Sequence, residues 1–288
     1  MPEDIRGLAG CKLAYNWKNH FRRVPPNIML GQLQTPIKAL ILDMDGVLYR
    51  HNEPIGDLPA IFNRIEELGL KVMYATNNTM STPEMYCDKL RRMGVASEAE
   101  QFITSPVATA HAMQQRWPQG GPIYMIGEVG LRSVMEKKGF YHAEEDVLAV
   151  VSGMDLEFPY DQMVKAVRLL LKGVPFIGTN PDLLYPTPDG PAIGTGGMLA
   201  VLEACSGVKP EIIGKPFPAM MNMALERLNV APTEALVVGD RLNTDIAAGQ
   251  AAGCQTALVL TGISTRKDAE KWKPRPDLVA ENLAALVE

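Results

Sequence analysis

The stretch "ILDMDGVLYR", residues 41–50, ends an apolar run with two aspartates, Asp43 and Asp45, that are one residue apart. Charged side chains are seldom buried unless a partner compensates their charge. A single carboxylate at this place is typical of a turn, but two carboxylates followed directly by Gly46 indicate a binding or catalytic site. The preceding residues, 37–42, read as a buried strand.

Composition indicates an ordinary globular protein. The chain has 288 residues, of which 47% are hydrophobic and 21% charged, and its net charge of −5 offers no electrostatic footprint for nucleic acid. No apolar run approaches the roughly 18 residues of a membrane span, and the first 30 residues lack the apolar centre of a signal peptide. Four scattered cysteines without CxxC spacing predict reduced thiols and no zinc site. We therefore expect a cytoplasmic protein with a small-molecule partner, bound to neither nucleic acid nor membrane.

Strands and helices alternate along the chain. A helix face formed by Ile61, Ile65 and Leu68 is followed by a buried strand at 70–75 and a helix at 81–94. This βαβα order predicts an α/β fold with a Rossmann-like parallel sheet covered by helices. Further expected elements are strands at 234–240 and 255–260 with a helix at 244–253 between them, which we expect to join the same sheet.

The middle of the chain predicts a second α/β unit. Its expected elements are strands at 122–127, 146–153 and 174–180, and helices near 130–138, 160–172 and 196–206. At the other end, residues 1–34 contain the basic, aromatic and proline-broken segment "KNHFRRVPPN". We expect this N-terminal extension to lie along the protein surface or along a neighbouring subunit.

Reactive side chains follow the ends of the expected core strands or lie in nearby loops, where open parallel sheets bind their ligands. They are Asp43, Asp45, Thr76, Asn77, Asn78, Lys215, Asp240 and Asp245. Carboxylates from two loops can hold Mg²⁺, which prefers oxygen ligands. A lysine and a threonine beside the metal can hold an anion, so the set describes phosphoryl transfer. Asp43 is suited to be the nucleophile, and Asp45 the acid, provided that burial and a neighbouring charge raise the pKa of Asp45.

Four motifs, "DMDGVL", "TNN", "GKP" and "GDRLNTDI", resemble in this order those of the haloacid dehalogenase-like phosphatases. "GTNPD" (178–182) and "GTGGMLAVLEACSG" (194–207) are similar to the branch of p-nitrophenylphosphatases, phosphoglycolate phosphatases and pyridoxal phosphate phosphatases. The resemblance implies a core formed by 35–111 and 209–288, with an inserted α/β cap at 112–208 that selects small phosphorylated metabolites. It also implies pairing of two copies through the cap.

The resemblance also implies a role for each motif residue. Asp43 matches the nucleophile and a Mg²⁺ ligand, and Asp45 matches the general acid and base, whose main-chain carbonyl also meets the metal. Thr76, Asn77 and Lys215 match the phosphate-binding positions, with Asn77 contributing its main-chain N–H. Asp240 matches a further metal ligand, which Asp245 supports through water or a hydrogen bond.

Other interpretations remain open from the sequence. Asn180 and Asp182 lie on a cap loop that either contacts the substrate or forms a turn, and "GTGG" (194–197) either binds an anion or begins a helix. Asp245 is also suited to cap a helix. A phosphomutase or a dehalogenase on the same scaffold, or an idle, receiver-like regulatory protein, are the rival functions. The four histidines, at 20, 51, 111 and 142, have no partners at ligand spacing, and we expect structural or surface roles for them.

Overall fold

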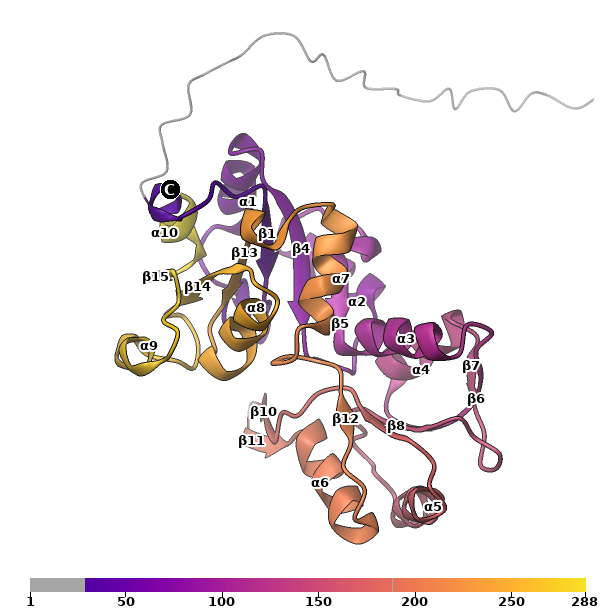
Figure 1. Ribbon diagram of the computed structural model, residues 1–288. Helices are drawn as coiled ribbons and strands as arrows, with labels where there is room; N and C mark the ends of the chain where they lie inside the picture. The colour runs from indigo at the N-terminus through magenta and orange to yellow at the C-terminus, as the bar shows by residue number, and fades with distance from the viewer. Residues whose placement is uncertain (1–28, 188) are drawn as a thin grey trace, which may run out of the picture.

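The computed structural model describes residues 29–187 and 189–288, which form two α/β lobes (Figure 1). Most of the predicted N-terminal extension, residues 1–28, lies outside the described residues. The remainder of the extension, residues 29–34, contains a short 3-10 helix, Leu30–Gln32. Met29 and Leu33, on either side of this helix, pack against the core. Within the described residues, no helix is long and apolar enough to cross a membrane.

The larger lobe, the core, is built on a six-stranded sheet in the order β15-β14-β13-β1-β4-β5, with every pairing parallel. Its strands are β1 (Ala39–Leu42), β4 (Lys71–Thr76), β5 (Phe102–Thr104), β13 (Ala235–Gly239), β14 (Gln255–Val259) and β15 (Leu278–Ala280). Its helices are α1 (Leu58–Glu67), α2 (Pro83–Arg92), α3 (Ser105–Arg116), α7 (Ala219–Leu228), α8 (Ala247–Ala251), α9 (Arg266–Lys271) and α10 (Leu283–Val287). The predicted Rossmann-like parallel sheet is confirmed.

Side-chain alternation along the central strand explains why helices cover both faces of this sheet. Ala39 and Ile41 of β1 belong to one buried apolar cluster, with residues of α3, α7 and α8. Leu40 and Leu42 belong to another, with residues of α1, α2 and α10. A strand buried on both faces must be apolar throughout, which is why a continuous run precedes Asp43.

Local signals in the sequence set the ends of the helices. Thr82 caps α2 by accepting the Met85 N–H through its side chain, and Asp57 caps α1 by accepting the Ala60 N–H. Gly69 follows α1 with a φ of +71°, a conformation that glycine adopts without strain.

The smaller lobe, the cap, has its own five-stranded parallel sheet in the order β12-β9-β8-β6-β7. Its strands are β6 (Gly121–Ile126), β7 (Phe140–His142), β8 (Val150–Ser152), β9 (Phe176–Gly178) and β12 (Glu211–Ile212), and its helices are α4 (Val129–Lys137), α5 (Tyr160–Leu171) and α6 (Thr195–Ser206). The predicted boundary at 111 falls inside α3, and β12 lies after the predicted boundary at 208. The cap sheet therefore includes a strand that follows the boundary at 208 that the resemblance implied.

Two hairpins and a π-helix, none of them predicted, complete the edge where the lobes meet. The hairpins are β2 (Tyr49–Arg50) with β3 (Glu53–Pro54) and β10 (Leu184–Thr187) with β11 (Gly190–Ile193). The π-helix, η4, spans Leu242–Ile246, and short 3-10 helices lie at Ala99–Gln101 and Pro232–Glu234. Figure 1 shows β10 and β11 between the cap and the carboxyl ends of the core strands. The chain thus encloses this edge of the core sheet from the cap side.

Candidate active site

The two aspartates of the opening motif lie directly after β1. The Asp43 N–H donates to Val238 O at 2.8 Å, which extends the pairing of β1 with β13 by one residue. Gly46 has a φ of +84°, and a Cβ on it would lie 2.7 Å from the Asp240 Cγ. Glycine therefore permits both the turn and the close approach of two acidic loops.

Lys215 is buried at the centre of the site, with 3% of its side chain exposed. Its ammonium donates to Asp43 Oδ1 and Asp245 Oδ1, each at 2.6 Å, and to Ala75 O at 2.8 Å. Burial lowers the pKa of Lys215, but the two carboxylates outweigh that effect and raise it above its ordinary value. All three ammonium protons are used, so contact with a phosphoryl oxygen requires the exchange of one of these bonds.

Thr76 and Asn77 follow β4 on the same edge. Thr76 is buried, and its hydroxyl oxygen accepts the Asn78 N–H at 3.2 Å. The Asn77 side chain binds the Lys215 backbone, since its Nδ2 donates to Lys215 O at 2.9 Å and its Oδ1 accepts the Lys215 N–H at 2.9 Å. The sequence predicted phosphate binding by the Asn77 main chain, and it gave no sign of this second role for the side chain.

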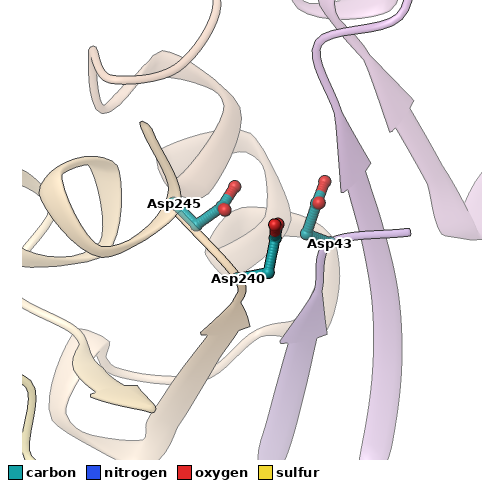
Figure 2. Close-up of side chains that lie close together, drawn as sticks. All are labelled: Asp43, Asp240 and Asp245. Atoms are coloured by element: carbon teal, nitrogen blue, oxygen red, sulfur yellow. The ribbon is translucent and has the colours of Figure 1, made fainter. Parts of the chain in front are cut away.

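Asp240 and Asp245 complete an acidic cluster with Asp43, and the three carboxylates lie close together (Figure 2). One oxygen from each lies within 4.8 Å of the others. Asp240 follows β13, and its Oδ2 accepts the Ile263 N–H at 2.8 Å. Asp245 belongs to η4, and its Oδ2 accepts the Arg241 N–H at 3.1 Å. Asp245, which we expect only to support the metal, therefore lies in the same cluster as Asp43 and Asp240, the two predicted side-chain metal ligands.

The acidity of the cluster is perturbed by burial and by mutual repulsion. Burial raises the pKa of Asp43 well above its usual range, Lys215 opposes the rise, and Asp245 and Asp240 add to it. Burial and the neighbouring Asp245 also raise the pKa of Asp240 to about 6. Keeping all these groups ionised therefore requires positive charge beyond Lys215.

A divalent cation fits the donor set. Three carboxylates face one ammonium, which leaves two negative charges uncompensated when all are ionised. Among the described residues, Asp240 Oδ1 is buried and accepts no hydrogen bond. A buried oxygen without a partner is unfavourable unless a cation or water meets it, and hard oxygen donors are those that Mg²⁺ prefers.

Asp45 lines the same cavity as the three clustered aspartates but is more exposed than they are. The cavity walls still displace much of the surrounding water, and this desolvation raises the pKa of Asp45. The predicted charge contribution was wrong in sign, because Lys89 and His51 lower the pKa and burial alone raises it. The predicted metal contact through its main-chain carbonyl stays a prediction.

A cavity of about 410 Å³ contains all of the predicted core-site residues and part of the cap. The two cap-loop residues, Asn180 and Asp182, are on its wall. The sequence analysis missed several other lining residues, namely Arg50, His51, Met80, Met154, Tyr185, Arg241 and Ile263. Arg241 was detectable, because it lies inside "GDRLNTDI", whereas Tyr185 belongs to a hairpin that the local pattern does not reveal.

His51, for which we expect a structural or surface role, is exposed in the turn between β2 and β3, and this turn also places it at the cavity. His142 is structural, since its Nδ1 accepts the Met125 N–H.

The structure also resolves in part the two alternatives for "GTGG" (194–197), an anion site or the start of a helix. The N–H groups of Gly194, Gly196 and Gly197 donate to carbonyl groups of the chain, so they hold the local turn rather than an anion.

Comparisons with known proteins agree with this architecture. Residues 40–141 match the family model described as haloacid dehalogenase-like hydrolase, and residues 212–286 match a related HAD-hydrolase-like model. An acid sugar phosphatase of Staphylococcus aureus is 35% identical over 240 residues, which cover 83% of this chain and 92% of that protein.

Solved structures show the same two-lobed fold. The p-nitrophenyl phosphatase from Archaeoglobus fulgidus superposes with a TM-score of 0.82 at 31% identity, covering 88% of this chain and 99% of that one. The 4-nitrophenylphosphatase from Thermotoga maritima gives a TM-score of 0.83 at 35% identity, covering 87% and 96%. Phosphatase activity is thus common to the similar proteins named here.

Proposed function

The chain belongs to the haloacid dehalogenase-like hydrolases and is a phosphatase, and from this premise we propose that it hydrolyses small phosphorylated metabolites through an aspartyl-phosphate on Asp43. The observation that carries the proposal is the ion pair between Lys215 and Asp43 inside an acidic cluster. This arrangement holds a carboxylate in place at the edge where parallel sheets bind their ligands.

In the first half of the reaction, an Asp43 oxygen attacks phosphorus and the bond from phosphorus to the leaving oxygen breaks. Asp45 gives its proton to that oxygen, for which a raised pKa is suitable. Thr76 and the Asn77 main-chain N–H hold the phosphoryl oxygens, together with Lys215 once it exchanges a bond.

In the second half, water attacks the phosphorus of the aspartyl-phosphate. Asp45, now ionised, takes the proton of that water, and the bond between Asp43 and phosphorus breaks to release phosphate. Residues of the cap form part of the cavity wall, and in this proposal they limit the access of bulk water during both halves.

Asp43, Asp240 and the Asp45 carbonyl are the groups we propose to hold Mg²⁺, with Asp245 supporting them. When bound, Mg²⁺ neutralises the charge that develops on the phosphoryl oxygens. Asp240 Oδ1, which is buried and accepts no hydrogen bond from the described residues, supports this assignment independently of the reaction.

The cavity supports a small leaving group, since about 410 Å³ suits a metabolite and not a protein surface. The similarity to an acid sugar phosphatase makes sugar phosphates the first substrates to test. We place the reaction in the cytoplasm, which the three free cysteines of the described residues, Cys87, Cys205 and Cys254, support.

Phosphate release from p-nitrophenyl phosphate and from a panel of sugar phosphates, measured with Mg²⁺ and with EDTA, tests the proposal. Wild type is expected to turn over in Mg²⁺, and Asp43→Asn is expected to lose more than about a thousandfold in kcat while remaining folded. Retained activity in Asp43→Asn would place the nucleophile elsewhere. Transfer of phosphate to a second hydroxyl of the substrate, without release, would favour the phosphomutase alternative.

A further inference from the structure

The Asn77 side chain is fully committed to neighbouring groups in the protein. One Nδ2 proton goes to Lys215 O at 2.9 Å and the other to Asp182 Oδ2 at 3.0 Å, while Oδ1 accepts the Lys215 N–H. Asn77 therefore holds both backbone polar groups of Lys215 and is itself held by Asp182.

Asp182 belongs to the cap and is held tightly within it. Its N–H donates to Asn180 Oδ1 at 3.1 Å, and its carbonyl accepts the Gly196 N–H of α6 at 2.9 Å. A Cβ on Gly196 would lie 2.2 Å from Pro181 O, so glycine is required for this close packing. The loop that carries Asp182 is thus fixed to the first turn of α6.

The same loop contacts the core at two further points. Asn180 Nδ2 donates to Asn77 O at 2.8 Å, and the Asp182 carboxylate lies 3.8 Å from the Arg241 guanidinium, next to Asp240 in the chain. Asp182 is mostly buried, with 18% of its side chain exposed. Hydrogen bonds to a charged acceptor in such surroundings are stronger than those between neutral groups.

We propose that Asp182 is a positioning residue through which the cap, in the position seen here, fixes Asn77 and thereby Lys215. This inference rests on the proposed function and goes beyond it, because it assigns to Asp182 a structural path to the nucleophile in place of the substrate contact that the sequence suggested. The path runs from the Asp182 carboxylate to the Asn77 amide, to the Lys215 backbone, and through the Lys215 ammonium to Asp43.

Steady-state kinetics of Asp182→Ala with p-nitrophenyl phosphate and with a sugar phosphate test the inference. A positioning role predicts that kcat falls by about tenfold or more, by the same factor for both substrates, with KM little changed. Asp182→Asn keeps an oxygen that can accept from Asn77 and is expected to recover most of kcat. Changes confined to KM, or different for the two substrates, would identify a substrate contact and overturn the inference, as would an Asp182→Asn variant no better than Asp182→Ala.

Glu84→Gln is the matched control for loss of an ion pair between the lobes. Glu84 of α2 contacts Lys137 of α4 at 2.6 Å, and both side chains are largely exposed. Its kcat is expected to stay within about twofold of wild type, because exposed ion pairs contribute little. If kcat fell as much in Glu84→Gln as in Asp182→Ala, any contact between cap and core would support activity, and the specific path through Asn77 would be refuted.

Hydrogen–deuterium exchange supplies a measurement that does not depend on activity. The peptide spanning residues 211–217 contains the Lys215 N–H that Asn77 accepts, and we expect it to exchange faster in Asp182→Ala than in Glu84→Gln. Unchanged protection in Asp182→Ala would overturn the inference. Absence of phosphate release from wild type would instead refute the proposed function, while leaving this measurement valid.

Discussion

Lys215 and Asp43 are 172 positions apart in the sequence, yet the Lys215 ammonium lies 2.6 Å from Asp43 Oδ1. The same ammonium binds Asp245 at 2.6 Å, so one buried lysine joins three segments of the core on either side of the inserted cap. Its position depends on the whole core being folded.

Replacing this lysine is expected to affect stability as well as activity. Lys215→Met leaves Asp43 and Asp245 buried without their cation, and breaking a buried pair costs about 3 to 5 kcal/mol in the free energy of unfolding. Protonation of the carboxylates relieves this cost, so the loss should be smaller at pH 5 than at pH 8, as measured by urea unfolding in EDTA.

Lys38→Met is the control for loss of a lysine ion pair. Lys38 pairs with Glu234 at the surface, where 64% of the lysine side chain is exposed, and its loss should cost no more than about 1 kcal/mol. If both variants lost the same free energy of unfolding, or if the loss in Lys215→Met did not depend on pH, the buried ion pairs of Lys215 would not be a source of stability.

Asp45→Asn should discriminate between leaving groups. p-Nitrophenolate departs with little help from an acid, whereas the alkoxide of a sugar requires a proton. We expect kcat to fall about 100-fold or more for a sugar phosphate and far less for p-nitrophenyl phosphate. Equal losses for the two substrates would assign Asp45 a role other than that of the acid.

The sequence located the core site because it depends on strand ends. Asp43, Thr76 and Asp240 each follow a strand of one parallel sheet, and the topology of such sheets brings strand ends together. Lys215 lies in a loop to which this strand-end rule does not apply, and a lysine beside the expected metal indicated anion binding before the resemblance matched it to a phosphate-binding position.

The features of the site that the sequence could not predict lie where the cap packs against the core. The cavity position of His51 and Tyr185 results from two hairpins at the meeting edge, and hairpins of this kind have weak local patterns. The Asn77–Asp182 contact joins residues that are 105 positions apart, and neither residue differs locally from an ordinary turn residue.

The raised pKa of Asp240 predicts a pH dependence of stability in the metal-free protein. Its pKa is about 6 in the fold and about 3.9 when unfolded, so the folded state binds more protons between these values. Stability present at pH 4 is therefore lost as the pH rises through 6, by about 2 to 3 kcal/mol. Asp240→Asn cannot ionise and should lack this step.

Urea unfolding of wild type and Asp240→Asn in EDTA, from pH 4 to pH 7, checks this expectation. Mg²⁺ should restore wild-type stability at pH 7 and have less effect on Asp240→Asn, because a ligand that binds only the folded state stabilises it. Parallel pH profiles for the two proteins would show that Asp240 ionisation is not the cause.

Gly262 tests whether the position of the Asp240 carboxylate matters for the metal. A Cβ on Gly262 would lie 1.8 Å from Asp240 Oδ2, so Gly262→Ala must displace that carboxylate, whereas Gly31 has open space around it. We expect Gly262→Ala to lower the free energy of unfolding by about 1 to 3 kcal/mol and to raise the Mg²⁺ concentration needed for half-maximal activity. Gly31→Ala should change neither quantity. If Gly262→Ala lost stability but kept its Mg²⁺ requirement, the Asp240 carboxylate would be a packing group and the metal would have to be held by the remaining acids.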